Sequence, residues 1–473
     1  MKSFSNLICR LPGGLSRKKG SSPVREDGTA IGTGYRLDSA SPHGYVLPER
    51  IVLADAWRKG HLWCFGTTRV GKTRIIENMI SQDIRRGHSV VMIDPKGDQE
   101  LFAKIVETAQ EAGRLGELMF ISPVFPEYSM AVDPLAHYYI PEELVAHIIS
   151  GVQVGREPFF YNVAYEISIA IVQSLLITDE GRGQSFNLTD VKNCMSRSEL
   201  ERLAAKVAGI DSPEARQLYT DMRKIIDSPQ DYYGKVSSSL RVALMELTTG
   251  HIGKIIGKGR RNLFIERLEK GEPVILLVHL GSLMIRKAAY TLGKVILSMI
   301  QSFVGRVFSS GRTVSPPLCL YMDEAHNVLY FMIDDLFAKA GGADVWVHGF
   351  VQSVSQLYSS IGRDYANTIL DNTNTKIFMR VPDYETAQYA ASHFGWKSRY
   401  SGVFGADGGI TMREEETEYL KPGDILSLRE REFYMMTYAG LFRGESSGVD
   451  PARTRIRLPR IRSGASLTGE EGP

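Results

Sequence analysis

Eight consecutive residues have the glycine, lysine and threonine spacing of a phosphate-binding loop. They form the pattern GxxxxGKT and comprise Gly66, Thr67, Thr68, Arg69, Val70, Gly71, Lys72 and Thr73. The two glycines allow backbone N–H groups to close around phosphate oxygens, Lys72 supplies a positive charge for the β- and γ-phosphates, and the Thr73 hydroxyl can ligate Mg²⁺. An apolar run precedes the loop and a helical pattern follows it, which is the setting such a loop requires. We therefore expect the chain to bind a nucleoside triphosphate together with Mg²⁺.

A second apolar run, residues 318–322, ends in two acids, Asp323 and Glu324. At the carboxyl end of a strand, Asp323 is placed to hold the Mg²⁺ shell, and Glu324 can polarise an attacking water. Acids are also favoured in the first turn of a helix, so the pair alone does not decide between the two interpretations. Its combination with a phosphate-binding loop favours the catalytic one. We expect hydrolysis, because a hydrolytic motor needs a carboxylate beside its Mg²⁺ aspartate and a nucleotide-gated switch does not.

Two further polar segments follow apolar runs. Gln352 comes after the run 344–351, a position that in this class of ATPase contacts the γ-phosphate or the attacking water, although a helix-capping role for Gln352 and Ser353 stays open. The stretch Ile-Asp-Pro-Lys-Gly-Asp ends another strand and contains Asp94 and Lys96. We expect one or both of these residues to lie close to the nucleotide, with a plain Pro-Gly turn as the alternative.

Phosphoryl transfer usually needs an additional positive charge, which a neighbouring subunit often donates. Arg380 lies at the end of a strand pattern and is the catalytic arginine that we predict, with Arg363 and Arg69 as further candidates. Solvation without any catalytic role is the alternative for each of them.

Short β-rich runs alternate with helical stretches, which is typical of a mainly parallel sheet flanked by helices and predicts an α/β fold. The expected strands are residues 61–66, 89–94, 117–121, 273–279, 318–323, 344–351 and 375–381. Between residues 141 and 262 the alternation stops and helical patterns dominate. The predicted domains are a flexible N-terminal arm at 1–45, a P-loop ATPase domain at 46–140 and 263–445, an inserted all-α domain at 141–262, and a basic, disordered tail at 446–473.

The composition is that of an ordinary globular protein, with 473 residues, 43% hydrophobic residues and a net charge of +2. Five arginines, however, crowd residues 453–462, so an anionic partner such as DNA or lipid would be met locally. The four cysteines are far apart and suggest neither a disulfide framework nor a metal knuckle. No apolar run reaches the length of a membrane-spanning helix, so we expect a cytoplasmic protein without a transmembrane segment.

The motifs together closely resemble those of the type IV coupling proteins of conjugation systems, the TraD/TraG-like family. The resemblance is nearest to the TraD subgroup of integrative conjugative elements and covers about residues 45–440. It is carried by residues 60–74, 82–87, 93–98, 321–326, 351–357 and 374–387. The Asp-Pro-Lys-Gly-Asp element at 94–98 is more specific than a phosphate-binding loop by itself.

This resemblance implies a RecA-like ATPase of the FtsK/HerA type that forms a hexamer at the inner face of the cytoplasmic membrane. Such proteins use ATP and Mg²⁺ to deliver relaxase-bound DNA to a type IV secretion channel, so DNA, the relaxase and channel proteins are the implied partners. By matching position, Lys72 and Thr73 would bind phosphate and Mg²⁺, Asp323 the metal, Glu324 the water and Gln352 the γ-phosphate. Many family members begin with transmembrane helices, and here we expect a partner to provide the membrane contact.

Two other functions fit the same motifs. A nucleotide-gated adaptor would recruit protein substrates to the secretion system without moving DNA. A chromosome- or repair-type HerA/FtsK motor would act on DNA outside conjugation. Stimulation of ATP hydrolysis by DNA separates a translocase from an adaptor, and loss of element transfer with normal cell division separates it from the second kind of motor.

Overall fold

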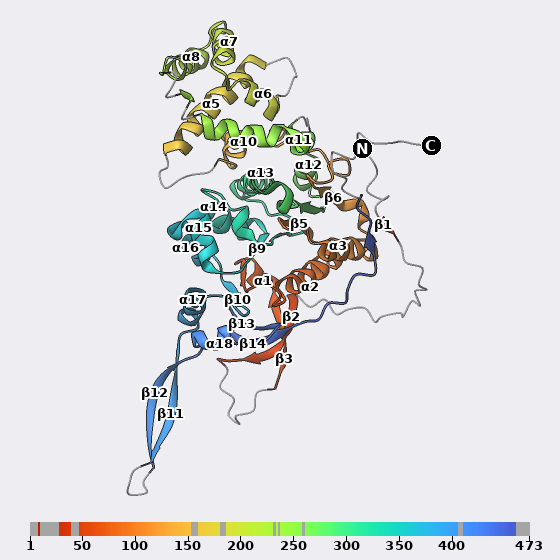
Figure 1. The fold of residues 1–473 in the computed structure, drawn as a ribbon, viewed down its shortest axis with the longest axis vertical. Helices are drawn as coiled ribbons and strands as arrows, with labels where there is room; N and C mark the ends of the chain where they lie inside the picture. Colours follow the sequence, from red (N-terminus) through yellow and green to blue (C-terminus); the bar gives the residue numbers. More distant parts are fainter. Residues whose placement is uncertain are drawn as a thin grey trace, which may run out of the picture.

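A computed structural model describes residues 8–9, 28–38, 47–152, 159–179, 186–229, 233–234, 237–257, 261–404 and 410–459. Its central element is an 11-stranded sheet with the strand order β3-β2-β14-β13-β10-β4-β9-β8-β5-β7-β6. Helices lie on both faces of this sheet (Figure 1). The fold is α/β with a mainly parallel sheet, as the alternation of elements predicts.

One half of the sheet, from β10 to β6, is parallel. Its strands are β4 (Leu62–Phe65), β5 (Ser89–Asp94), β6 (Leu118–Ile121), β7 (Ile275–His279), β8 (Leu318–Met322), β9 (Val345–Val351) and β10 (Thr375–Phe378). Each lies within one of the expected strand segments. In β4, Leu62 and Cys64 pack into the core on one face of the sheet, whereas Trp63 and Phe65 pack into the core on the other. Because both faces are covered, these strands are continuously apolar in sequence.

The other half of the sheet is antiparallel and was not predicted. It consists of β13 (Glu432–Thr437), β14 (Gly440–Ser446), β2 (Gly28–Arg36) and β3 (Glu49–Ala54). The expected flexible arm at 1–45 is therefore wrong for residues 28–36, which form a largely buried strand. The glycines that suggested flexibility have a packing role. A Cβ atom on Gly32 would lie 2.0 Å from the carbonyl oxygen of Glu445, and one on Gly34 2.1 Å from that of Arg443.

Two different groups of helices cover the faces of the sheet. On one face, α2 (Lys72–Arg85) and α3 (Gln99–Glu111) bury apolar side chains with those of β4 and β5. The other face is covered by the long helix α13 (Ser282–Ser309) and by helices that come after β8 in the chain. The latter are η4 (Ala325–Asn327), α14 (Asp334–Lys339), η5 (Ala340–Ala343), α15 (Val354–Ile361), α16 (Arg363–Asp371), α17 (Tyr384–Phe394) and α18 (Pro422–Leu426). Short helices α1 (Asp55–Arg58) and η2 (Leu115–Glu117) precede β4 and β6.

Between β6 and β7 the chain forms a helical region, which lies at one end of the long axis of the molecule (Figure 1). Its helices are α4 (Pro141–Ile149), α5 (Phe159–Asp179), α6 (Leu188–Asn193), α7 (Arg197–Ala208), α8 (Pro213–Ile226), α10 (Ser238–Thr248), α11 (Gly250–Ile252) and the π-helix η3 (Gly253–Gly257). Helix α12 (Leu263–Glu269) then leads back to β7. The helical region thus lies within the stretch where we expect the inserted domain.

Two helices, α5 and α13, are long and apolar enough to cross a membrane by length and composition alone. From the sequence, we had expected no apolar run long enough for a membrane-spanning helix. In the folded chain, however, 44% of the apolar window of α5 and 67% of that of α13 are buried inside the protein. Burial of this kind is also what the core helix of a globular domain shows, so the two helices are weak support for a membrane span.

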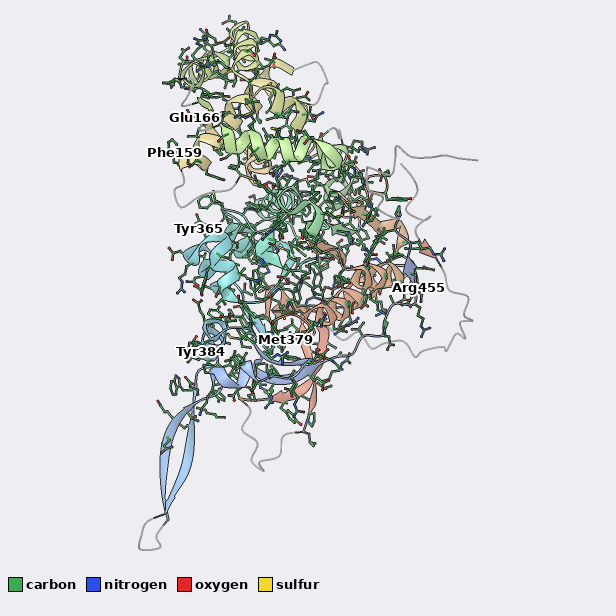
Figure 2. The ribbon with its side chains drawn as sticks, viewed as in Figure 1. Phe159, Glu166, Tyr365, Met379, Tyr384 and Arg455 are labelled. Atoms are coloured by element: carbon green, nitrogen blue, oxygen red, sulfur yellow. The ribbon has the colours of Figure 1, made fainter. Side chains whose placement is uncertain are left out.

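Two antiparallel ribbons lie outside the main sheet. Strands β11 (Trp396–Phe404) and β12 (Ile410–Glu418) form a ribbon that projects at the end opposite the helical region (Figure 1). Near the C-terminus, β15 (Arg455–Ile456) pairs with β1 (Ile8–Cys9), and Arg455 of this ribbon is labelled in Figure 2.

The tail also departs from the disorder expected at 446–473. A carboxylate oxygen of Glu107 on α3 accepts hydrogen bonds from the backbone N–H groups of Arg453 and Thr454. The prediction of disorder is therefore wrong for this part of the tail. Arg460 and Arg462 lie outside the described residues, so the expectation for the basic cluster is tested only in part.

Candidate nucleotide site

The phosphate-binding loop connects β4 directly to α2. Gly71 has a φ of 110°, which a residue with a side chain rarely adopts, and this conformation lets α2 begin at Lys72. Lys72 is buried, and its ammonium group donates hydrogen bonds to the backbone carbonyls of Gly66 and Thr67. Burial lowers the pKa of Lys72, while the nearby Glu324 and Asp323 carboxylates act in the opposite direction.

Neighbouring strands hold this loop from both sides. The N–H of Gly66 donates to the carbonyl of Val351 at the end of β9, and the N–H of Thr67 donates to the carbonyl of Arg380 just beyond β10. The loop therefore starts in a fixed position, whereas Thr68 and Arg69 at its tip are exposed. A phosphate-binding loop needs backbone N–H groups that phosphate oxygens can reach. The exposed tip, which follows the fixed end of β4, meets this need.

Asp323 and Glu324 follow β8 at the same edge of the sheet. The backbone N–H of Asp323 donates to Ile93 in the neighbouring β5, and both acidic side chains are only about 5% exposed. Glu324 adopts a left-handed φ of 42°, which is uncommon for a residue with a side chain and turns the chain sharply after the strand. Because β4, β9 and β8 are parallel neighbours, the structure brings Lys72 and the two acids, about 250 positions apart in the chain, to the same edge of the sheet. The two acids oppose the fall in the pKa of Lys72 there.

Lys96 connects β5 to this acidic pair. Its ammonium group lies 2.6 Å from Oε1 of Glu324 and 3.4 Å from Oδ2 of Asp323. Burial would raise the pKa of Glu324, but the hydrogen bond and charge of Lys96 lower it overall, which keeps this carboxylate ionised. Burial raises the pKa of Asp323 to about 6, although Lys96 opposes that rise.

Asp94 and Gly97 fix the turn that carries Lys96. The Asp94 carboxylate accepts hydrogen bonds from the backbone N–H groups of Lys96, Gly97 and Asp98, so its oxygens are used within the turn. Gly97 has a φ of 82°, and a Cβ atom there would lie 2.7 Å from the ring of His279. Asp94 therefore supports the turn, and Lys96 is the member of this segment that reaches the acids.

Gln352 follows β9 and donates a hydrogen bond from Nε2 to Oε1 of Glu324, at 3.1 Å. The helix-capping role that was its alternative belongs to Ser353, whose hydroxyl accepts from the N–H of Gln356 at the start of α15. Gln352 and Lys96 thus hold the same oxygen of Glu324. A side chain held in this way is prepared to act at a defined position.

The three candidate arginines have different environments. Arg69 is exposed at the tip of the loop, and Arg380 is exposed beyond β10 while its backbone braces Thr67. Arg363 forms an ion pair with Glu385 and lies over the ring of Tyr358 at 4.5 Å. Its guanidinium already has partners, so Arg69 and Arg380 are the arginines left more accessible at this edge of the sheet.

Arg431, which was not predicted as a site residue, lies against the phosphate-binding loop. Its backbone N–H donates to the carbonyl of Val70, and its Cγ would lie 3.4 Å from a Cβ atom on Gly71. Arg431 itself has a left-handed φ of 70°. Arg431 directly precedes β13, which belongs to the unpredicted antiparallel half of the sheet. Its position beside the loop could be predicted only from the strand order of that half.

A buried ion pair lies beside β8, the strand that precedes the two acids. The Arg58 guanidinium binds both carboxylate oxygens of Asp83 on α2, at 2.6 and 2.7 Å, and donates to the hydroxyl of Tyr321. Tyr321 is two residues before Asp323, so this network fixes the strand that presents the acids. His88 and Cys319 also lie within 4.8 Å of Asp83, but a cation there would stand beside Arg58.

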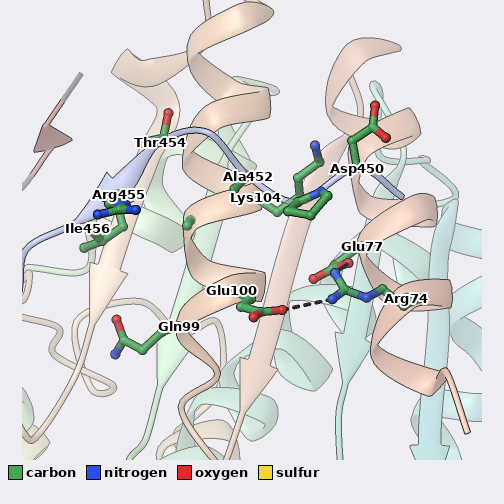
Figure 3. A pocket seen from close by; sticks show the side chains of 12 residues that line it. Arg74, Glu77, Gln99, Glu100, Lys104, Asp450, Ala452, Thr454, Arg455 and Ile456 are labelled. Carbon is green, nitrogen blue, oxygen red and sulfur yellow. Dashed lines mark hydrogen bonds and ion pairs between the residues drawn. The ribbon is translucent and has the colours of Figure 1, made fainter. Parts of the chain in front are cut away.

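A pocket of about 300 Å³ lies next to α2 and α3, outside the group formed by Lys72 and the acids (Figure 3). Arg74 and Glu100 form an ion pair of 2.9 Å across it, and residues 450–452 and 454–456 of the C-terminal segment line its other side.

The residues at the strand ends fit a nucleotide with Mg²⁺. Oδ1 of Asp323 is buried and has no hydrogen-bond partner within the described part of the chain. This oxygen could bind a Mg²⁺ ion together with the hydroxyl of Thr73, because Mg²⁺ is a hard cation that prefers oxygen ligands. Backbone N–H groups at the start of α2 and the charge of Lys72 would receive the phosphates.

Comparison with known proteins identifies a family segment and a fold. Residues 317–427 match the family model described as the TraM recognition site of TraD and TraG. This segment contains Asp323, Glu324, Gln352 and Arg380. No curated protein matches the chain in sequence.

Solved structures share the fold at low sequence identity. The unbound bacterial conjugative coupling protein TrwBdeltaN70 has a TM-score of 0.67 and 14% identity, over 92% of this chain and 92% of that chain. The plasmid coupling protein TrwB in complex with ADP and Mg²⁺ has a TM-score of 0.56 and 16% identity, over 95% of this chain and 99% of that chain. VirB4 of Thermoanaerobacter pseudethanolicus has a TM-score of 0.51 and 12% identity, over 90% of this chain and 98% of that chain. The family match and the shared fold together confirm the resemblance to the type IV coupling proteins.

Proposed function

We propose that this chain, which has the fold and a family segment of the type IV coupling proteins, is an ATP-hydrolysing DNA translocase. It would act as the coupling factor that delivers relaxase-bound DNA to a type IV secretion channel. The observation that carries this proposal is the convergence of Lys72, Asp323 and Glu324 at one edge of the sheet. The TraM recognition segment and the names of the similar structures support conjugation as the setting.

Each residue of the site has a defined task in this proposal. Lys72 and the N–H groups of the loop bind the phosphates, while Thr73 and Asp323 hold Mg²⁺, which would neutralise charge on the phosphates when bound. Glu324 is kept ionised by Lys96 and can accept a proton from an attacking water. Gln352, which donates to Glu324, would fix the direction of that carboxylate or contact the γ-phosphate.

The assembly and its location are further parts of the proposal. A homohexamer would place the site of one subunit against its neighbour, so that an exposed arginine such as Arg69 or Arg380 could reach a phosphate across the interface. The protein would work at the inner face of the cytoplasmic membrane, with the membrane contact made through a partner.

Hydrolysis in the presence and absence of DNA tests the function. We expect Lys72→Ala to abolish ATP hydrolysis and Glu324→Gln to slow it strongly while nucleotide binding persists. We also expect DNA to stimulate the parent protein several-fold. Lys339→Ala is a suitable control, because Lys339 is exposed on α14 and pairs only with the neighbouring Asp335 among the described residues. An unchanged rate in Lys72→Ala would refute the site.

The adaptor remains the second candidate, because the matched segment is described by its recognition of a protein, TraM. An adaptor would hydrolyse ATP without a response to DNA and would bind a protein partner in a nucleotide-dependent way. A parent protein that binds relaxosome proteins but shows no DNA-stimulated hydrolysis would favour it.

A further inference from the structure

The start of α13 exposes an unusual set of side chains at the same end of the parallel strands as the nucleotide site. Leu283 is 96% exposed and Met284 59% exposed, and they are followed by the exposed Arg286 and Lys287. Ile285 between them has non-helical angles, φ −138° and ψ 43°, so the first turn is kinked away from the rest of the helix. We refer to residues 282–287 as the α13 entry segment.

Backbone hydrogen bonds fasten the α13 entry segment to the turn that carries Lys96. The N–H of Leu280 donates to the carbonyl of Asp94 at 3.0 Å, and the N–H of Ser282 donates to the carbonyl of Pro95 at 2.8 Å. Gly281 between them has a φ of 60°, and a Cβ atom there would lie 2.5 Å from Val124. The segment is thus fixed at its base while its apolar and basic side chains project outward.

Electrostatics give a second connection to the catalytic acids. Burial lowers the pKa of His326; Glu324 raises it, while Lys96 and, last, Arg286 lower it further. His326 in turn lies 3.7 Å from Oε2 of Glu324.

Helix α10 of the inserted region extends the same surface. Lys287 forms an ion pair of 3.0 Å with Glu246, and together with Val242 these residues line a pocket of about 160 Å³. Val242 is 40% exposed and Met245 50% exposed. The surface therefore combines exposed apolar side chains with positive charge from Arg286, since Glu246 already has Lys287 as a partner.

We propose that the α13 entry segment and the adjacent face of α10 bind single-stranded DNA. Arg286 would contact a phosphate, and Leu283 and Met284 would contact the faces of unstacked bases, with the Met sulfur suited to a flat π-surface. A duplex hides its base faces inside the stack, so apolar side chains this exposed fit a single strand better. This inference rests on the proposed DNA translocase and names the form of DNA that the motor grips.

The ties to Pro95 and Asp94 make this a coupling element. Movement of Lys96 on nucleotide binding would be transmitted through the hydrogen bonds of Leu280 and Ser282 to the DNA-binding side chains. By thermodynamic reciprocity, DNA at the segment would change the affinity of the site for nucleotide.

Fluorescence anisotropy with labelled single-stranded and duplex oligonucleotides of equal length tests the binding. We expect the parent protein to prefer the single strand, and Leu283→Ser/Met284→Ser to lose about tenfold in that affinity, or about 1.4 kcal/mol. Arg286→Ala should reduce the slope of log K against log salt by about 0.7, the value for one phosphate contact on a single strand. Both variants should lose DNA stimulation of hydrolysis.

Matched controls are Leu47→Ser, which changes another highly exposed leucine, and Arg312→Ala, which changes an exposed arginine beyond the other end of α13. Both should bind DNA as the parent does. Melting temperatures confirm that the variants fold, and Arg286→Ala keeps the test valid should the double variant be unstable.

The outcomes separate the two proposals. If DNA does not stimulate the parent protein, the translocase function fails. If DNA stimulates the parent and all variants alike, with unchanged affinity and salt slope, the function stands and the role of the α13 entry segment is refuted. Variants that keep parental DNA binding but change oligomeric mass in native mass spectrometry would instead assign the segment to a subunit interface, which also overturns the proposal.

Discussion

Replacing Lys96 by methionine removes the positive charge that holds Glu324 while leaving a side chain of similar length. The ammonium group lies 2.6 Å from Oε1 of Glu324; since the Lys96 side chain is 48% exposed but that of Glu324 only 5%, the dielectric of water gives the smallest attraction to expect. At this distance the attraction is about 1.6 kcal/mol, or about one pKa unit. Without it the pKa of Glu324 rises, and a higher pH is needed to ionise the base.

The assay is the pH dependence of kcat/KM for ATP hydrolysis, because this ratio reports the ionisation of the free enzyme. We expect the acidic limb of the profile to move upward by about one pH unit in Lys96→Met. Lys339→Met is the control, since its lysine pairs with Asp335 away from the site and should leave the limb in place. An unchanged limb in Lys96→Met would refute the electrostatic role of this residue, whatever happens to the maximal rate.

Three further predictions concern single positions. Glu324→Gln should lower ATP hydrolysis by about 10²- to 10⁴-fold in a phosphate-release assay, whereas equilibrium binding of nucleotide stays within a few-fold of the parent. Gly97→Ala should destabilise the protein by roughly 1–3 kcal/mol in thermal melts, because it adds strain and a clash with His279. Gly113→Ala, which adds a Cβ at a similar φ with no neighbour within 4 Å, should cost less. Burial raises the pKa of Asp133 to about 7, so its side chain holds a proton in the folded state at pH values where the unfolded chain has lost it. The free energy of unfolding should therefore increase as pH falls from about 8 to about 4. Asp133→Asn should remove this dependence, worth up to about 4 kcal/mol, from melting curves recorded across that range.

The parallel half of the sheet and the principal site residues could be predicted from sequence because their signals are local. Each parallel strand is buried on both faces and so forms an uninterrupted apolar run, and the polar residue that follows each run marks the edge where ligands bind. The signal of the phosphate-binding loop is also local. Gly71, Lys72 and Thr73 stand at a fixed spacing because the loop must supply consecutive N–H groups. Asp323 and Glu324 were found through the strand that precedes them.

The antiparallel half could not be predicted, because its signals depend on partners far away in the chain. Strand β2 contains Gly32 and Gly34, which suggest a loop until β14 is seen to approach so closely that no side chain fits. The position of Arg431 against the phosphate-binding loop follows from that same sheet order. Likewise, the sequence suggested that Lys96 lies near the nucleotide but could not show that it pairs with Glu324, 228 positions later.

Lys96 stands at the meeting point of the two proposals. Its turn receives the hydrogen bonds of Leu280 and Ser282 through the carbonyls of Asp94 and Pro95, and its ammonium group holds Glu324. A single turn therefore contacts both the Glu324 carboxylate and the base of the surface that we assign to DNA. If DNA stimulates hydrolysis by shifting this turn, releasing Glu324 from Lys96 is the step that the shift controls. The charge of Lys96 would then matter less in the DNA-bound enzyme, so saturating single-stranded DNA should reduce the difference between the acidic limbs of the parent and Lys96→Met.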